Sequence, residues 1–105
     1  MNPDALPFDA DAMLAGLGEW VTCESPTFDA ASVNRMMDIA TRSLILAGAR
    51  IERIAGRQGL GDCVRATFPH ATPNEPGILV MGHLDTVHPI GTLAKLPFRR
   101  DGNRA

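Results

Sequence analysis

The chain lacks both a long hydrophobic run and a strong net charge. Its longest apolar stretches, such as residues 78–81, are far shorter than the roughly 20 residues that a membrane-spanning helix needs. Ten Lys and Arg residues stand against twelve Asp and Glu residues, which leaves a formal charge of -2. A charge this small gives no electrostatic reason to expect nucleic acid or an anionic membrane surface as a partner. We therefore expect neither partner.

Cysteine is scarce, and the features of an exported protein are missing. The two cysteines, Cys23 and Cys63, lie far apart and belong to no Cys-x-x-Cys pair. We expect two small buried apolar side chains rather than a disulfide, a redox pair or a soft-metal site. The first residues are acidic and are interrupted by Pro3 and Pro7, whereas a secretory signal has basic residues followed by an apolar core. These absences predict a cytoplasmic protein.

The first part of the chain predicts one helix after a disordered leader at residues 1–8. Asp9 is a favourable helix N-cap, and Phe8 and Met13 have the spacing of a hydrophobic staple. The helix should end at Ser25-Pro26, because the residue before a proline avoids the α-helical region. Two internal glycines destabilise it by up to about 1 kcal/mol each, so it should depend on the packing of its apolar stripe. That stripe consists of Met13, Leu14, Leu17, Trp20 and Val21.

A second helix should begin near Thr27 or Asp29, which are both suitable caps, and should stop at Gly48. Its apolar side chains recur at helical spacing and predict one buried stripe. The members of this stripe are Val33, Met36, Met37, Ala40, Leu44 and Ala47.

The remainder of the chain has strand patterns and loops. The expected strands are residues 49–54, 63–68, 78–81 and 98–100, and the four apolar residues of the third should be buried on both faces. The glycines of residues 56–62 match neither a dinucleotide fingerprint nor a phosphate loop, which favours a hairpin connection. Residues 88–97 are expected to form a loop. These elements predict an α/β fold, with two N-terminal helices packed on a mixed β-sheet of about four strands.

The polar residues that follow the expected strand 78–81 are the candidates for chemistry. Side chains alternate along an extended chain, so His83 and Asp85 should point to the same side, with Leu84 on the other. Ligands of open α/β sheets bind at strand ends, and Gly82 would allow an ion or substrate to approach the backbone. An imidazole beside a carboxylate suits a metal ligand with a supporting partner. Taken alone, the two residues also fit a structural hydrogen-bonded pair.

Residues 78–102 resemble the zinc-dependent exopeptidase family, which includes the bacterial glutamate carboxypeptidases, succinyl-diaminopimelate desuccinylase, acetylornithine deacetylase and aminoacylase. The resemblance depends on the sequence Gly-His-Leu-Asp-Thr-Val at residues 82–87, directly after the apolar stretch. Residues 91–98, Gly-Thr-Leu-Ala-Lys-Leu-Pro-Phe, and the Asp101-Gly102 turn extend it and look most like the glutamate carboxypeptidase branch. The segment from Trp20 to Thr27 also resembles the N-terminal helix and loop of this family.

This resemblance implies that residues 9–105 are the N-terminal part of a metallohydrolase catalytic domain, truncated before the lid and dimerisation domain. His83 would bind one of two zinc ions, with cobalt as a possible substitute, and Asp85 would be the catalytic carboxylate. The reaction would be hydrolysis of an amide bond in a peptidyl or N-acyl amino acid. The full-length protein would be a homodimer through its lid domain.

The other metal ligands and the general base of the family would lie beyond Ala105. The Asp101-Gly102 hairpin signal, with only three residues after it, also indicates a fragment of a longer chain. We expect the 105-residue chain alone to bind catalytic metal poorly and to be inactive, because a zinc site needs three or four ligands.

Two alternatives remain at this point. One is an N-acyl amino acid deacylase of the same family, a desuccinylase or deacetylase. The other is a non-catalytic α/β binding module. His88 is expected near the mouth of the site, His70 in a solvated loop, and at most one of Arg99 and Arg100 could meet a substrate carboxylate, because adjacent strand residues point to opposite faces.

Overall fold

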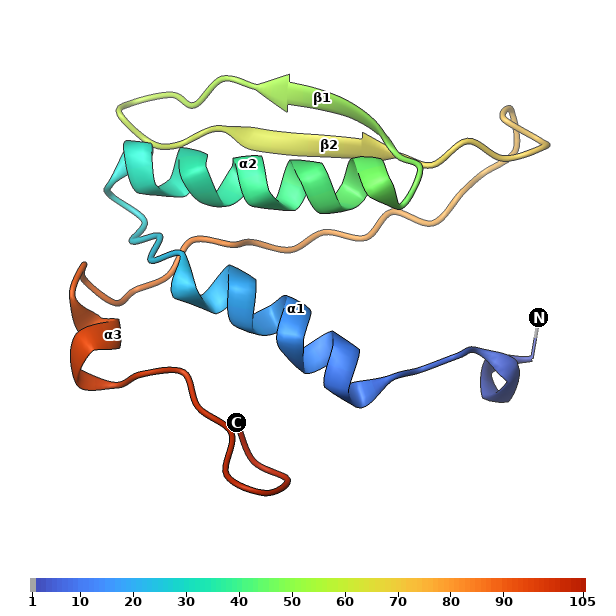
Figure 1. Cartoon of the computed structure of the whole chain (residues 1–105). Coiled ribbons are helices and arrows are strands. Elements are labelled where there is room, and N and C mark those ends of the chain that lie inside the picture. Colours follow the sequence, from blue (N-terminus) through green and yellow to red (C-terminus); the bar gives the residue numbers. More distant parts are fainter. Residues whose placement is uncertain (1) are drawn as a thin grey trace.

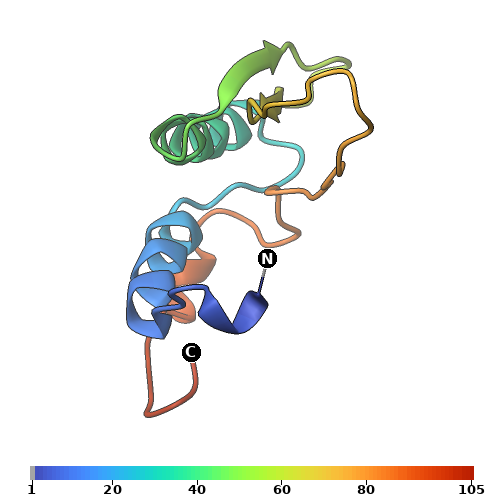
Figure 2. The same ribbon diagram turned by 90° about the vertical axis from the view of Figure 1, so that its right-hand side faces the viewer.

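The computed structural model describes residues 2–105 and has a mixed α/β architecture. Helix α2 (Ala30–Leu46) packs on an antiparallel sheet of two strands, β1 (Arg50–Ile54) and β2 (Cys63–Thr67) (Figure 1). Helix α1 (Ala10–Thr22) contacts α2 and lies on the side of α2 that faces away from the strands in Figure 1. An extended segment, residues 78–86, runs between α1 and α2 in Figure 1, and in Figure 2 it lies to the right of the two helices at a height between them. The short helices η1 (Pro3–Ala5) and α3 (Thr92–Lys95) complete the chain.

The structure is open, and its core is small. The Cα radius of gyration is 16.2 Å, whereas a compact domain of this length would have about 13 Å. In the described part of the chain, the buried hydrophobic residues are Val33, Met36, Ala40 and Ala49. Three of these lie on α2, so the core sits between this helix and the elements on either side of it.

The start of α1 confirms the predicted cap, but its apolar stripe is not buried. The Asp9 carboxylate accepts hydrogen bonds from the Asp11 and Ala12 backbone N–H groups, both at 3.0 Å. No residue of α1 is buried, and Met13 and Leu17 are 61% and 52% exposed. Few elements cover this helix, so the packing expected of its apolar stripe is partial: Leu14 and Trp20 are half-buried, and Met13, Leu17 and Val21 are exposed.

Two features next to α1 were not predicted from the sequence. One is the short helix η1 before it, and the other is the contact of Phe98 with its surface. Within the expected disordered leader, η1 forms because the Asn2 side chain accepts from the Asp4 N–H at 3.0 Å and Pro3 fixes the first φ angle. At the other end of the chain, Phe98 packs on Gly18, where a Cβ would lie only 2.9 Å from the Phe98 ring. The glycine that weakens the helix therefore provides the space for this ring.

Helix α2 begins and ends where the sequence predicts. Asp29 is its N-cap and accepts from the Ser32 N–H at 2.9 Å. At its end, Gly48 has φ 94°, and the Gly48 and Ala49 N–H groups donate to the Ile45 and Leu44 carbonyls at 2.9 and 3.0 Å. This pair of bonds is a Schellman motif, in which the left-handed residue is a glycine.

The β1–β2 hairpin also confirms the sequence prediction, and Asp62 organises its connection. The strands pair antiparallel, with Ile51 opposite Ala66 and Arg53 opposite Val64. The Asp62 carboxylate accepts from the Gly56 N–H and from Arg53 Nε, both at 2.9 Å. These two bonds, the Gly56 bond first, hold the pKa of Asp62 below its usual range. The carboxylate thus closes the glycine-rich connection as the sequence analysis expected of a hairpin turn.

The other two expected strands do not form, so the sheet has two strands rather than about four. Residues 78–81 are extended but exposed, with Ile78 at 96% and Val80 at 86%. Within residues 2–105, no hydrogen bond reaches the backbone of residues 76–83. A strand buried on both faces needs neighbouring strands and two covering layers, and the described residues supply neither. Residues 98–100 lack a pairing partner in the same way.

The expected loop at residues 88–97 contains a helical turn, α3, which the sequence analysis missed. Gly91 precedes it with φ 93°. The predicted Asp101-Gly102 turn is present: Asp101 and Arg104 form an antiparallel bridge, and Gly102 has φ 58°. No helix among the described residues is long and apolar enough to span a bilayer.

The exposed apolar segment 78–81 predicts self-association. Extended apolar residues with free backbone groups are templates for pairing with another chain. We expect the sedimentation coefficient of the chain to rise with protein concentration, and Val80→Lys to suppress this rise. Val87→Lys is the matched control, because Val87 is 90% exposed but lies outside the segment. Sedimentation velocity over a concentration series checks this, and a wild-type coefficient that is independent of concentration would contradict it.

Candidate functional site

His83 and Asp85 converge, as the alternation of side chains predicted. His83 Nδ1 lies 3.2 Å from Asp85 Oδ1 and 3.1 Å from the Asp85 backbone oxygen. A carbonyl and an ionised carboxylate only accept hydrogen bonds, so a ring that carries a proton on Nδ1 satisfies both contacts. In the neutral form of that tautomer the lone pair is on Nε2, and the His83 side chain is 82% exposed. In this tautomer the arrangement presents a ring nitrogen that can bind a metal ion.

The segment that carries this pair is held by residues 25–27, from the loop between α1 and α2. Thr86 N–H donates to the Ser25 carbonyl at 2.8 Å, and Thr27 N–H donates to the Thr86 carbonyl at 3.0 Å. Between them, Pro26 and Thr86 form a parallel bridge. The Ser25 hydroxyl, which is 1% exposed, donates to the Leu84 carbonyl at 2.8 Å. We call this contact the 25–27/84–86 pairing.

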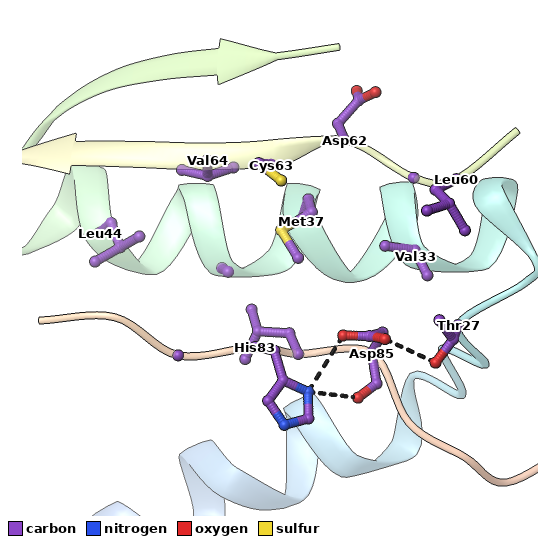
Figure 3. A pocket seen from close by; sticks show the side chains of 14 residues that line it. Thr27, Val33, Met37, Leu44, Leu60, Asp62, Cys63, Val64, His83 and Asp85 are labelled. Carbon is purple, nitrogen blue, oxygen red and sulfur yellow. Dashed lines mark hydrogen bonds and ion pairs between the residues drawn. The ribbon is translucent and has the colours of Figure 1, made fainter. Parts of the chain in front are cut away.

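Thr27 also contacts the carboxylate itself. Its hydroxyl donates to Asp85 Oδ2 at 2.7 Å (Figure 3). This hydrogen bond is the main cause that lowers the pKa of Asp85 below its usual value, against the opposing effect of burial, and His83 adds to it. Asp85 is therefore a carboxylate at neutral pH. In the sequence, Thr27 is a possible helix cap and the last residue of the segment that resembles the family's N-terminal helix and loop. Neither feature indicates a contact with a residue so far along the chain.

Glu24 is a second residue that sequence analysis missed. Its carboxylate accepts from the Gly91 N–H and the Leu93 N–H, both at 3.0 Å. These bonds, the Gly91 bond first, lower the pKa of Glu24. They satisfy backbone donors at the start of α3 and so fasten this turn to the end of α1.

The His83–Asp85 pair lies where two pockets meet. The first, of about 320 Å³, lies between α2, β2 and residues 82–85, and Figure 3 shows apolar α2 side chains such as Val33 and Met37 across from the pair. The second, of about 390 Å³, lies between α1, residues 83–88 and α3. Both His83 and Asp85 line both pockets. A small molecule could therefore approach the pair from either side of its segment.

The other residues singled out in the sequence take more peripheral places. His88 is exposed and lines the second pocket. His70 is in an exposed loop, as predicted. Arg100 pairs with Asp11 and donates to the Gly102 carbonyl at 2.8 Å, and it lines neither of the two pockets at the pair. Arg99 is exposed.

The two cysteines are free thiols, and one of them departs from the expectation of burial. Cys23 is half-buried, but Cys63 is exposed and lines the first pocket. Cys63 begins β2, and within residues 2–105 no strand pairs with β2 other than β1. No further strand therefore covers the Cys63 side chain, and it remains exposed.

The side chains that could ligate a metal ion are too dispersed among the described residues to form a complete zinc site. Among residues 2–105, no three His, Cys, Asp or Glu side chains gather closely enough to hold a metal ion. His83 Nε2 fits the role of one ligand, but three or four ligands are needed. The described residues thus supply part of a site and do not complete one.

No family model, curated protein or solved structure matches this chain.

The Glu24 contact predicts a pH-dependent attachment of α3. The pKa of Glu24 is lowered in the folded state, so its carboxylate stabilises the contact at pH values above the ordinary pKa of 4.5. This stabilisation is lost as the pH falls through the lower folded-state pKa. We expect the Gly91 and Leu93 amide proton shifts to move towards unbonded values as the pH falls through the lowered pKa of Glu24.

NMR spectra recorded over a pH series measure this change. Glu24→Gln should abolish the pH response of both amides, because the amide side chain does not titrate. Glu19→Gln, a matched change within α1, should leave the response intact. A wild-type chain whose two amide shifts stay constant from pH 7 to pH 3 would contradict the assignment.

Proposed function

We propose that this chain is the N-terminal portion of a zinc-dependent metallohydrolase that cleaves the amide bond of a peptidyl or N-acyl amino acid, as glutamate carboxypeptidases do. One observation carries the proposal: Asp85 hydrogen-bonds Nδ1 of an exposed imidazole and so leaves Nε2 of His83 free. Metal-binding histidines commonly donate their other ring N–H to a carboxylate in this way. The sequence at residues 82–87 and 91–98 gives the same interpretation by resemblance.

The chain's own residues would have distinct tasks in such an enzyme. His83 would be a ligand through Nε2, and Asp85 would make the ring more basic and keep its tautomer. When bound, zinc would supply a water of lowered pKa and polarise the substrate carbonyl. The pockets beside the pair would receive the amide substrate and exclude part of the bulk water.

The remaining ligands would come from a part of the full-length protein outside residues 1–105, together with a lid domain through which that protein would dimerise. The open shape and the uncovered segment 78–81 support this view, since further strands and layers could pack there. In this proposal residues 9–105 are the opening part of the catalytic domain. A deacylase of the same family would use the same His83–Asp85 pair and would differ in its substrate.

A non-catalytic α/β binding module is the second candidate. It is favoured by the finding that no three potential ligands gather within residues 2–105. In that case the His83–Asp85 contact would be a structural pair that holds the segment beside Thr27.

Zinc content and hydrolysis separate these candidates. A chain extended through the remaining ligands should bind zinc and hydrolyse N-acyl glutamate or a peptidyl glutamate, whereas the 105-residue chain should do neither. In the extended chain, His83→Ala should remove one zinc ion and the activity, and Asp85→Asn should lower zinc affinity or activity roughly 10- to 100-fold.

His70→Ala is the matched control, because it removes an imidazole from an exposed loop and should change neither quantity. Hydrolysis by the 105-residue chain would refute the view that the site is incomplete. An extended chain that binds no zinc would favour the non-catalytic module. Comparison of N-acyl and peptidyl substrates distinguishes the deacylase from the carboxypeptidase.

A further inference from the structure

The Thr27 hydroxyl has two acceptors but only one proton. Asp85 Oδ2 lies at 2.7 Å and the Thr86 carbonyl at 3.2 Å. The shorter contact goes to a charged carboxylate, and charge-assisted hydrogen bonds are the stronger ones. The proton is therefore directed to Asp85, and Thr86 receives its main bond from the Thr27 backbone N–H.

Thr27 is fixed in place before it meets the carboxylate. Its backbone belongs to the 25–27/84–86 pairing, with hydrogen bonds to residue 86 on both sides of Pro26. Proline fixes its own φ angle, and a β-branched side chain has few χ1 rotamers. The hydroxyl is thus held at one position relative to Asp85 and does not follow the carboxylate if that group turns.

A free Asp carboxylate rotates easily, because its terminal torsion is broad. Here one oxygen, Oδ2, is bonded to Thr27, and the other, Oδ1, is bonded to His83 Nδ1 (Figure 3). Rotation of the carboxylate would break the 2.7 Å bond to Thr27. The threonine therefore sets the direction of Oδ1, which is one of the two acceptors that His83 Nδ1 meets. The other acceptor is the Asp85 backbone oxygen at 3.1 Å, so the tautomer depends on Thr27 through the carboxylate contact alone.

We propose that Thr27 is a positioning residue that acts through Asp85: it orients the carboxylate so that His83 keeps its proton on Nδ1 and its lone pair on Nε2. This inference rests on the proposed function for its catalytic meaning, since an Nε2 lone pair is what a metal ion would bind. The orientation itself is a property of the 105-residue chain. Thr27 ends the Trp20–Thr27 segment of the resemblance and lies far in sequence from residues 82–87, and the resemblance itself gives Thr27 no role.

The test is the tautomer of His83 in the metal-free 105-residue chain, measured from its ring nitrogen shifts in two-bond proton–nitrogen NMR spectra at a pH where the ring is neutral. The wild type should be mainly the Nδ1–H tautomer. Thr27→Val keeps the shape but removes the donor, and it should lower the ratio of Nδ1–H to Nε2–H by a factor of roughly 3 to 10, the effect of one lost hydrogen bond. Thr27→Ser keeps a hydroxyl and should restore the wild-type ratio.

Thr86→Val is the matched control. It removes a neighbouring threonine hydroxyl that makes no hydrogen bond in the described structure, and the ratio should stay unchanged. Thr27→Ala replaces the valine variant if that variant does not fold. A wild-type ring that is mainly Nε2–H, or a wild-type ratio in the folded valine or alanine variant, would overturn the inference.

The outcomes separate this inference from the proposed function. The His83 tautomer could depend on Thr27 while the extended chain neither binds zinc nor hydrolyses amides. That result would support the inference and refute the proposed function. A zinc-dependent extended enzyme whose His83 tautomer is insensitive to Thr27 would do the reverse.

Discussion

The candidate site depends on the 25–27/84–86 pairing. Residues 84–86 follow an extended segment without backbone partners in the described chain, and they become fixed where they meet residues 25–27. Two backbone bonds, the buried Ser25 hydroxyl and the Thr27 hydroxyl act at this one place. Without this pairing, a His–Asp contact that is mostly exposed would have little to hold it, because exposed ion pairs contribute little by themselves.

Hydrogen bonds rather than a large core organise this part of the molecule. The buried hydrophobic side chains belong to α2 and the start of the hairpin, whereas Asp62, Glu24 and Asp85 each accept hydrogen bonds that position a loop or turn. Each of these carboxyl groups has a lowered pKa for that reason. The acidic residues thus act as fixed acceptors for segments that apolar packing does not cover.

The features that the sequence predicted correctly are those set by contacts between residues close together in the chain. Asp9, Asp29 and Gly48 mark helix ends through bonds to residues two to four positions away, and the β1–β2 hairpin follows from alternation and its glycines. The convergence of His83 and Asp85 likewise follows from the alternation of side chains along an extended segment. The segment 78–81 failed as a strand because a strand is defined by its partners, which a local pattern does not contain. Thr27 and Glu24 were missed for the same reason, since they act on residues 84–93, far along the chain.

The anchors of the site have a mechanical consequence, because they occupy consecutive positions. Glu24 holds the first turn of α3, and residues 25–27 hold residues 84–86. Any rotation of the end of α1 would therefore carry the imidazole and α3 together as one rigid unit. The short interval 87–90, fastened at both ends, would travel with them, so His88 would stay beside the second pocket.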